Sequence, residues 1–143
     1  MKVAQILKSK GDMVFTVKLQ ETVGAAAALL HSRRIGALVV MAEGDAVAGI
    51  LSERDVVSLC AQEGGAALER PVTSCMTEKV EFAAPADTID ALLAKMTDRR
   101  IRHLPVCEAG RLLGVVSIGD LVKWKIAEVE AEAEGMKAYI AAG

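Results

Sequence analysis

Apolar residues in the first half of the chain follow first the spacing of a helix and then that of a buried strand. In residues 21–33 apolar side chains recur every three or four positions, which predicts a helix capped by Thr22. Residues 35–41 are apolar almost throughout, which predicts a buried strand. The pattern then predicts a hairpin turn at residues 43–45, a strand at residues 47–51 and a helix from Ser52 to residue 63.

The second half of the chain repeats this plan. Apolar positions predict a helix at residues 87–97, followed by a strand at residues 101–107. The pattern then predicts a turn at residues 108–110, a strand at residues 112–116 and a helix from Ser117 to residue 125.

The two halves are internal repeats of one helix-strand-strand-helix unit. Ile35 aligns with Ile101 and Gly49 with Gly114, so the first hairpin is one residue longer than the second. Units of this size are barely stable alone, and we expect them to pack into one α/β (α+β) globule. The sequence divides into residues 1–70 (first repeat with the N-terminal segment), residues 71–125 (second repeat) and residues 126–143 (helical tail).

Beyond residue 125 an apolar stripe continues at helical spacing among acidic residues. Its members are Ile126, Val129, Ala133, Met136 and Ile140. The stripe predicts an amphipathic C-terminal helix. Such a stripe is buried either on its own domain or on a partner subunit, and the spacing does not decide between the two.

One short motif occurs at both strand-to-helix junctions. Residues 49–55 read G-I-L-S-E-R-D, and residues 114–120 read G-V-V-S-I-G-D. A serine at a helix start with an acidic residue three positions later is typical of a capping box, which only stabilises the helix end. The same junction suits a ligand, because a carboxylate accepts from ribose hydroxyls and a helix N-terminus attracts phosphate. Aspartate is shorter than the usual glutamate of a capping box, which favours the ligand.

A basic stretch precedes the buried strand of each repeat. In the second repeat it contains Arg100 and Arg102-His103, and arginine binds phosphate with two parallel hydrogen bonds. The alternative is a solvated basic loop. The first repeat keeps Arg34 but has Gly36-Ala37 in place of Arg102-His103, so two phosphate-binding ends would not be equivalent.

Composition narrows the classes of function. A net charge of −2 and an aromatic content of 3% argue against a nucleic-acid-binding protein. No apolar run reaches the roughly 18 residues of a membrane span, and no signal peptide is recognisable. Three cysteines without C-x-x-C spacing indicate a reducing, cytoplasmic location. We expect no metal site and no enzyme activity, because His103 has no second ligand at suitable spacing and no catalytic motif occurs.

Two copies of G-h-h-[ST]-x-x-D, each after an apolar strand, resemble a tandem pair of cystathionine β-synthase (CBS) domains. The resemblance extends from residue 3 to Trp124, and residues 102–106, R-H-L-P-V, show it best. With its tail the chain is similar to small bacterial proteins that contain a CBS pair and little else. The resemblance implies two small sheets, each with two helices, packed with pseudo-two-fold symmetry.

The resemblance also implies a function. It implies a regulatory module, not an enzyme, that binds an adenine nucleotide between the repeats and acts on a partner protein. AMP, ADP or ATP is the implied ligand, NAD(H) and S-adenosylmethionine are alternatives, and no catalytic cofactor is implied. Association into homodimers is implied as well. The competing hypotheses are a structural dimer without a ligand and a weak nucleic-acid binder that uses residues 99–103.

Site residues follow from the resemblance position by position. Asp55 and Asp120 would hold ribose, and Ser52 and Ser117 would approach ribose or phosphate. Phosphate would be held by Arg102 and His103 with help from Arg34, Arg54 and Arg100. The adenine would pack against residues 13–15, Gly36, Ala37, Lys79, Val80, Glu81, Leu104 and Pro105.

Overall fold

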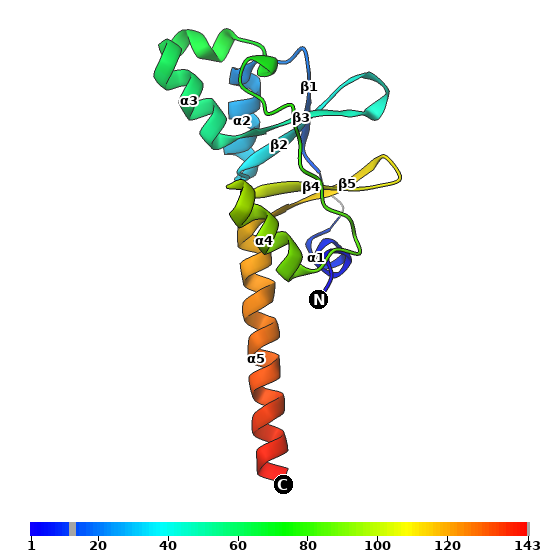
Figure 1. Ribbon diagram of the computed structural model, residues 1–143. Coiled ribbons are helices and arrows are strands. Elements are labelled where there is room, and N and C mark those ends of the chain that lie inside the picture. Colours follow the sequence, from blue (N-terminus) through cyan, green and yellow to red (C-terminus); the bar gives the residue numbers. More distant parts are fainter. Residues whose placement is uncertain (12–13, 143) are drawn as a thin grey trace. The chain divides into compact units, whose positions relative to one another are not determined.

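The computed structural model describes Met1–Gly11 and Val14–Ala142 and has the mixed α/β fold that the sequence predicts (Figure 1). The chain forms two compact units. Unit 1 consists of Met1–Asp12, Ala83–Glu108 and Leu113–Gly143, and unit 2 consists of Met13–Phe82 and Ala109–Leu112. Met13, in the predicted adenine contact, and Gly143, in the predicted tail, lie outside the described residues.

Unit 2 contains a three-stranded sheet in the order β1-β2-β3. β1 (Thr16–Lys18) runs parallel to β2 (Ala37–Met41), and β2 pairs antiparallel with β3 (Val47–Ser52). The register shifts between Val40 and Met41, where the longer first hairpin accommodates its extra residue. Both strands predicted for the first repeat are therefore present.

Two helices pack on the elements of this sheet. They are α2 (Val23–Arg33) and α3 (Glu53–Glu63). Thr22 caps α2 as predicted, since its Oγ1 accepts from the N–H of Ala25 at 3.1 Å. The buried side chains of the main cluster are aliphatic: Val17, Ala26, Leu30, Leu38, Val40, Leu51 and Val72.

The segment between the repeats is packed into unit 2. Two short 3-10 helices, Gly64–Glu69 and Val72–Ser74, follow α3. The N–H of Val23 donates to the carbonyl of Arg70 at 2.8 Å, which ties this segment to the start of α2. Gly64-Gly65 therefore ends a helix rather than opening a loose linker.

Unit 1 is built around a two-stranded hairpin. β4 (His103–Glu108) pairs with β5 (Arg111–Ser117). Ala109 and Gly110 between them have positive φ values of 51° and 76°. Positive φ at both central residues is typical of a type I′ turn, whose twist matches that of the paired strands. The turn predicted here is confirmed.

Three helices contribute to the core of unit 1. They are α4 (Ile89–Arg99), the start of α5 (Ile118–Ala142) and α1 (Val3–Lys10), a helix that the sequence analysis did not predict. Their buried residues form one cluster with both strands: Val3, Ile6, Ala83, Ile89, Leu92, Met96, Leu104, Val106, Val116 and Leu121. The N-terminal helix thus belongs to the unit that holds most of the second repeat, and the division of the sequence at residues 70 and 125 stays a prediction.

The predicted tail continues the last helix without a break. α5 begins after Ser117 and extends past α4 to Ala142 (Figure 1). Its first turns pack on unit 1 through Leu121 and Trp124. The stripe beyond them is exposed, with 53% of Ile126 and 67% of Met136 accessible to solvent. The stripe is therefore not buried on its own domain, which was one of the two alternatives.

Candidate ligand-binding site

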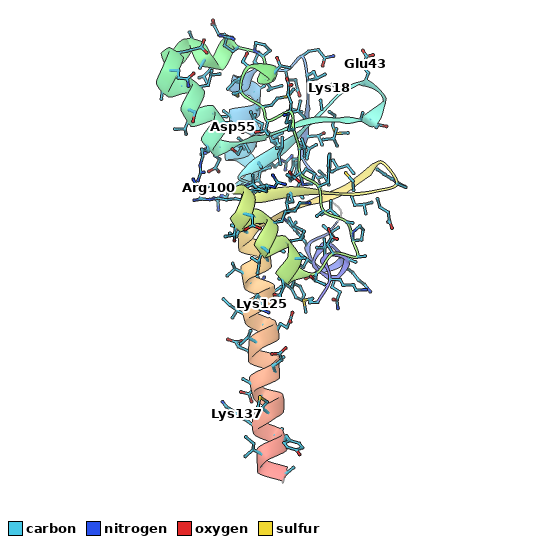
Figure 2. The ribbon with its side chains drawn as sticks, viewed as in Figure 1. Lys18, Glu43, Asp55, Arg100, Lys125 and Lys137 are labelled. Atoms are coloured by element: carbon cyan, nitrogen blue, oxygen red, sulfur yellow. The ribbon has the colours of Figure 1, made fainter. Side chains whose placement is uncertain are left out.

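In unit 2 the repeated motif forms a capping box at the start of α3. The backbone N–H of Ser52 donates to Oδ2 of Asp55 at 2.9 Å, and the N–H of Asp55 donates to Oγ of Ser52 at 3.3 Å. The Ser52 hydroxyl also lies 3.1 Å from the same Oδ2. Asp55 is labelled where α3 begins in Figure 2. The serine and aspartate thus satisfy the N–H groups that a helix start leaves unpaired.

In unit 1 the same box starts α5, with one addition. The N–H of Ser117 donates to Oδ2 of Asp120 at 2.9 Å, and the N–H of Asp120 donates to Oγ of Ser117 at 3.1 Å. Lys10, from α1, adds its Nζ at 2.6 Å from the same oxygen. The sequence analysis missed Lys10, because nothing in its spacing connects α1 to the second copy of the motif.

These bonds confirm the capping interpretation of both motifs. The inference that aspartate is too short to close the box is wrong, because Oδ2 of each aspartate reaches the serine N–H at 2.9 Å. The hydrogen bonds given above for both carboxylates involve Oδ2. The other oxygen of each carboxylate can still accept from a ligand, so capping and ligand binding are compatible.

A backbone hydrogen bond holds each strand start beside the neighbouring helix start. The N–H of Glu53 donates to the carbonyl of Gly36 at 3.0 Å, and that of Ile118 donates to the carbonyl of Arg102 at 2.8 Å. In unit 1 this bond brings Arg102 and the start of β4 next to Ser117. The backbones of Arg102 and His103 therefore lie beside the helix start that carries Ser117 and Asp120, and the role of these residues in binding stays a prediction.

Arg34 and Arg100 occupy equivalent, strained positions. Each follows the last residue of a helix with left-handed backbone angles, φ 53° and ψ 45° for Arg34 and φ 55° and ψ 42° for Arg100. In the next residue of each repeat the backbone N–H donates back to a helix carbonyl, from Ile35 to Leu30 and from Ile101 to Met96. These bonds complete the same helix-ending motif in both repeats. Both arginine side chains are exposed, and Figure 2 labels Arg100 at the end of α4.

The glycine of each motif lets another segment pack closely against its strand: Thr77 against β3 at Gly49, and Leu7 against β5 at Gly114. A Cβ on Gly49 would lie 2.7 Å from the carbonyl oxygen of Thr77, which is paired with Ile50 by two backbone hydrogen bonds. A Cβ on Gly114 would lie 2.7 Å from a methyl group of Leu7. Two of the predicted adenine contacts follow Thr77 directly in the chain: Lys79 is exposed and Val80 is half-buried.

Other predicted adenine contacts lie deeper in the fold. Ala37, Leu104 and Pro105 are buried, and Leu104 belongs to the core of unit 1. A ligand would therefore meet these positions through their backbone. Arg54 is exposed in the first turn of α3. Arg33, which was not among the predicted site residues, stacks over the ring of Phe15 with its guanidinium carbon 4.9 Å from the ring centre.

The environment shifts the ionisation of groups in and near the two boxes. Burial alone would raise the pKa of the Asp120 carboxyl, but the hydrogen bonds from Lys10 and Ser117 outweigh it and hold that pKa below its usual value. Burial raises the pKa of Cys107, and burial together with the charges of Asp55 and Cys60 raises that of Cys75. A raised thiol pKa leaves less thiolate, which argues against a nucleophilic role for either cysteine.

The described residues contain no group of three or more His, Cys, Asp or Glu side chains that could hold a metal ion. Among the described helices, none combines the length and the apolar character needed to cross a membrane.

The fold and the doubled junction define a pair of CBS domains. The sequence matches the CBS domain family over residues 9–62 and again over residues 72–127, so the chain belongs to this family. A mitochondrial CBS domain-containing protein of Arabidopsis thaliana is 33% identical over 99% of this chain and 72% of its own length. The structure of a CBS-domain protein from Agrobacterium tumefaciens is 43% identical, with a TM-score of 0.83 over 85% of this chain and 91% of its own.

Two more distant solved structures share the fold and contain ligands. A CBS domain protein from Pyrobaculum aerophilum, in complex with AMP, is 24% identical with a TM-score of 0.75 over 84% of this chain and 89% of its own. A CBS domain pair in complex with methylthioadenosine and S-adenosylmethionine is 22% identical with a TM-score of 0.80 over 90% of this chain and 98% of its own. At these identities the likeness concerns the fold alone.

Proposed function

We propose that this protein is a regulatory module that binds an adenine nucleotide between its two repeats and acts on a partner protein. The ligands of the two distant CBS structures are adenosine compounds, which supports this class of ligand. AMP, ADP and ATP are the first candidates, and NAD(H) and S-adenosylmethionine are alternatives. The bound nucleotide undergoes no reaction, and no catalytic cofactor takes part.

The observation that carries the proposal is the junction at Ser117 and Asp120. A helix start there provides backbone N–H groups and a favourable dipole for a phosphate. The backbone bond from Ile118 to Arg102 holds a guanidinium-bearing residue and the adjacent His103 at this helix start. Asp120 adds an acceptor for ribose hydroxyls. Groups suited to sugar and to phosphate therefore lie within one junction.

The strained arginines give independent support. A residue with a Cβ costs about 1–2 kcal/mol in the left-handed region, and glycine is the residue that avoids this cost. Both repeats nevertheless place an exposed arginine there, Arg34 and Arg100, directly before the strand that leads to the junction. Backbone strain at a repeated position favours a functional role for the side chain, and phosphate binding suits a guanidinium.

The two junctions are expected to bind nucleotide unequally. The first has Gly36-Ala37 where the second has Arg102-His103, so fewer cations face a phosphate there. The second has Lys10 on Oδ2 of its aspartate, so the carboxylate that would accept from a ribose is already partly neutralised by an ion pair. We further expect a cytoplasmic homodimer in which ligand binding changes the arrangement that the partner protein recognises.

Thermal unfolding tests the proposal with purified protein and a panel of AMP, ADP, ATP, NAD, NADH and S-adenosylmethionine. A ligand at about 100 times its Kd adds about 2.7 kcal/mol to the free energy of unfolding of the protein that binds it. Asp120→Ala and Asp55→Ala should each reduce the ligand-induced rise in Tm. Because each also removes a helix cap worth about 1 kcal/mol, Thr22→Ala and Thr88→Ala, which remove the caps of α2 and α4, are the matched controls.

The controls should lower the Tm of the ligand-free protein and retain the full ligand-induced rise. A flat response to the whole panel overturns the proposal and favours the structural dimer. RNA or DNA binding that falls steeply with salt, and that no nucleotide competes with, would instead favour the nucleic-acid binder.

A further inference from the structure

The exposed stripe of α5 has the spacing of a coiled-coil seam. Starting at Val122, successive apolar positions of the stripe lie four, three, four, three and four residues apart. The members, here called the seam, are Val122, Ile126, Val129, Ala133, Met136 and Ile140. Alternation of this kind places Ile126, Ala133 and Ile140 at a positions and the other three at d positions of a heptad.

The seam is distinct from the face by which α5 joins unit 1. Leu121 is fully buried in the core, whereas 42% of its neighbour Val122 is exposed. Lys125 lies on the side toward α4, where its Nζ is 2.9 Å from Oδ1 of Asp90. The exposed fractions along the seam are largest toward the C-terminus, with 67% at Met136 and 72% at Ile140. Binding at the seam therefore need not displace α5 from its own unit.

The end of α5 lacks the contacts that usually hold a helix in water. Residues 129–142 are exposed throughout, and an isolated helix of this length is marginally stable. Gly135 in its middle costs about 1 kcal/mol relative to alanine. The ion pair of Lys137 with Glu134, at 3.6 Å, contributes only a few tenths of a kcal/mol. Burial of the seam against another helix would supply the stabilisation that this segment lacks on its own.

The charged residues that flank the seam favour a second copy of α5, in parallel orientation, as the partner helix. The flanking e and g positions hold Lys125 (g), Glu130 (e), Glu132 (g) and Lys137 (e). Two parallel copies pair each g position with the next e position of the other copy, so Glu132 faces Lys137 of the second copy, and Lys125, which also pairs with Asp90 of its own chain, faces Glu130. Both pairs are attractive, and symmetry doubles them.

An antiparallel pair of the same helices would be repulsive. It would align e with e and g with g, which sets Glu130 against Glu130, Glu132 against Glu132, and Lys123 against Lys137. Like charges at these positions are unfavourable. We propose that two copies of this chain associate through the seams of α5 as a parallel two-stranded coiled coil. The proposal does not rest on nucleotide binding.

Sedimentation velocity of the full chain tests the seam. The test variant is Val129→Glu/Met136→Glu at two d positions, and the matched control is Ala131→Glu/Ala138→Glu on the outer face of the same helix. Both add two glutamates to one exposed segment. We expect the wild type and the control to dimerise and the seam variant to dimerise at least about 100-fold more weakly, a loss of about 2.7 kcal/mol. Far-UV circular dichroism should show lower helicity in the seam variant alone.

Charge reversal tests the orientation. In a parallel pair Glu132→Lys places two lysines together and should weaken the dimer, and Glu132→Lys/Lys137→Glu should restore it. In an antiparallel pair position 132 faces itself, so Glu132→Lys would leave dimerisation unchanged and overturn the parallel arrangement. A wild-type monomer at all concentrations, or a seam variant that dimerises like the wild type, overturns the proposal as a whole.

Discussion

The Nζ of Lys10 lies 2.6 Å from Oδ2 of Asp120 and 2.9 Å from the carbonyl oxygen of Val115. The N-terminal helix thereby places a cation on one of the two motif aspartates. Among the described residues, hydrogen bonds to the equivalent carboxylate of Asp55 come from Ser52. Helix α1 therefore adds to the second junction a cation that the motif itself does not contain.

Lys10→Met should strengthen the binding of adenosine, which has ribose but no phosphate. The lysine partly neutralises Asp120 and so weakens it as an acceptor for ribose hydroxyls, and a partly exposed ion pair is worth up to about 1 kcal/mol. Its removal should lower the Kd for adenosine by up to about fivefold. Isothermal titration calorimetry measures this, with Lys8→Met, on the same helix, as the control. An unchanged Kd would show that the charge of Lys10 does not affect the binding of ribose at Asp120.

The stabilisation that comes from Asp120 should depend on pH. Its pKa is lowered in the folded protein, so the folded state favours the ionised carboxylate. The contribution is fully present above the unfolded pKa of about 4 and is lost as the pH falls through the lowered folded value. Urea titrations measure the difference in unfolding free energy between wild type and Asp120→Asn. This difference should be constant near neutral pH and should become smaller below about pH 4.

The same comparison in a Lys10→Met background provides the control. Loss of the lysine removes a major cause of the lowered pKa, so the pH-dependent part of the difference should become smaller. A difference that stays constant from neutral to acidic pH would contradict the assigned cause.

Gly49→Ala should destabilise the protein more than Gly114→Ala. The new Cβ at position 49 meets the backbone oxygen of Thr77, which cannot move without disturbing its pairing with Ile50. At position 114 it meets the end of the Leu7 side chain, which can rotate away. We expect a loss of about 2–3 kcal/mol for Gly49→Ala and about 1 kcal/mol for Gly114→Ala, measured by urea unfolding. Equal losses would show that the Thr77 contact can relax.

Arg100→Gly should separate stability from binding. Glycine relieves the left-handed strain while keeping the backbone N–H that ends α4, so the free energy of unfolding should rise by up to about 1 kcal/mol. Loss of the guanidinium should weaken AMP binding several-fold. Arg99→Gly, one residue earlier and still inside the helix, is the control and should only destabilise, by about 1 kcal/mol. Unchanged AMP binding in Arg100→Gly would exclude this arginine from the site.

Local patterns predicted most of the fold because local interactions determine it. The caps at Thr22 and Ser52, the turn at Ala109-Gly110 and the alternation of elements depend on residues within a few positions of each other. Helix α1 was missed although Val3, Ile6 and Leu7 have helical spacing, because eight residues give too short a pattern.

The candidate site was predictable only in part. The motif located the serines and aspartates, but only the three-dimensional structure shows that both aspartates close their boxes through Oδ2 and that Lys10 joins one of them. The contact of Lys10 with Asp120 spans most of the chain, and no sequence spacing encodes such a contact. The strain at Arg34 and Arg100 was equally invisible, because arginine is not a residue that indicates a left-handed turn.

Helix α1 has a consequence for the order of events during synthesis. The N–H of Val3 donates to the carbonyl of Asp87, and the N–H of Ile89 donates to the carbonyl of Met1, so the segment around α1 is synthesised well before its partners and meets them only after the first repeat has been made. Nearly all of unit 2 lies in one uninterrupted stretch and can fold in the meantime. Until residues 83–121 of the core of unit 1 have been made, the apolar side chains of Val3 and Ile6 stay uncovered, and the nascent chain exposes a short hydrophobic segment.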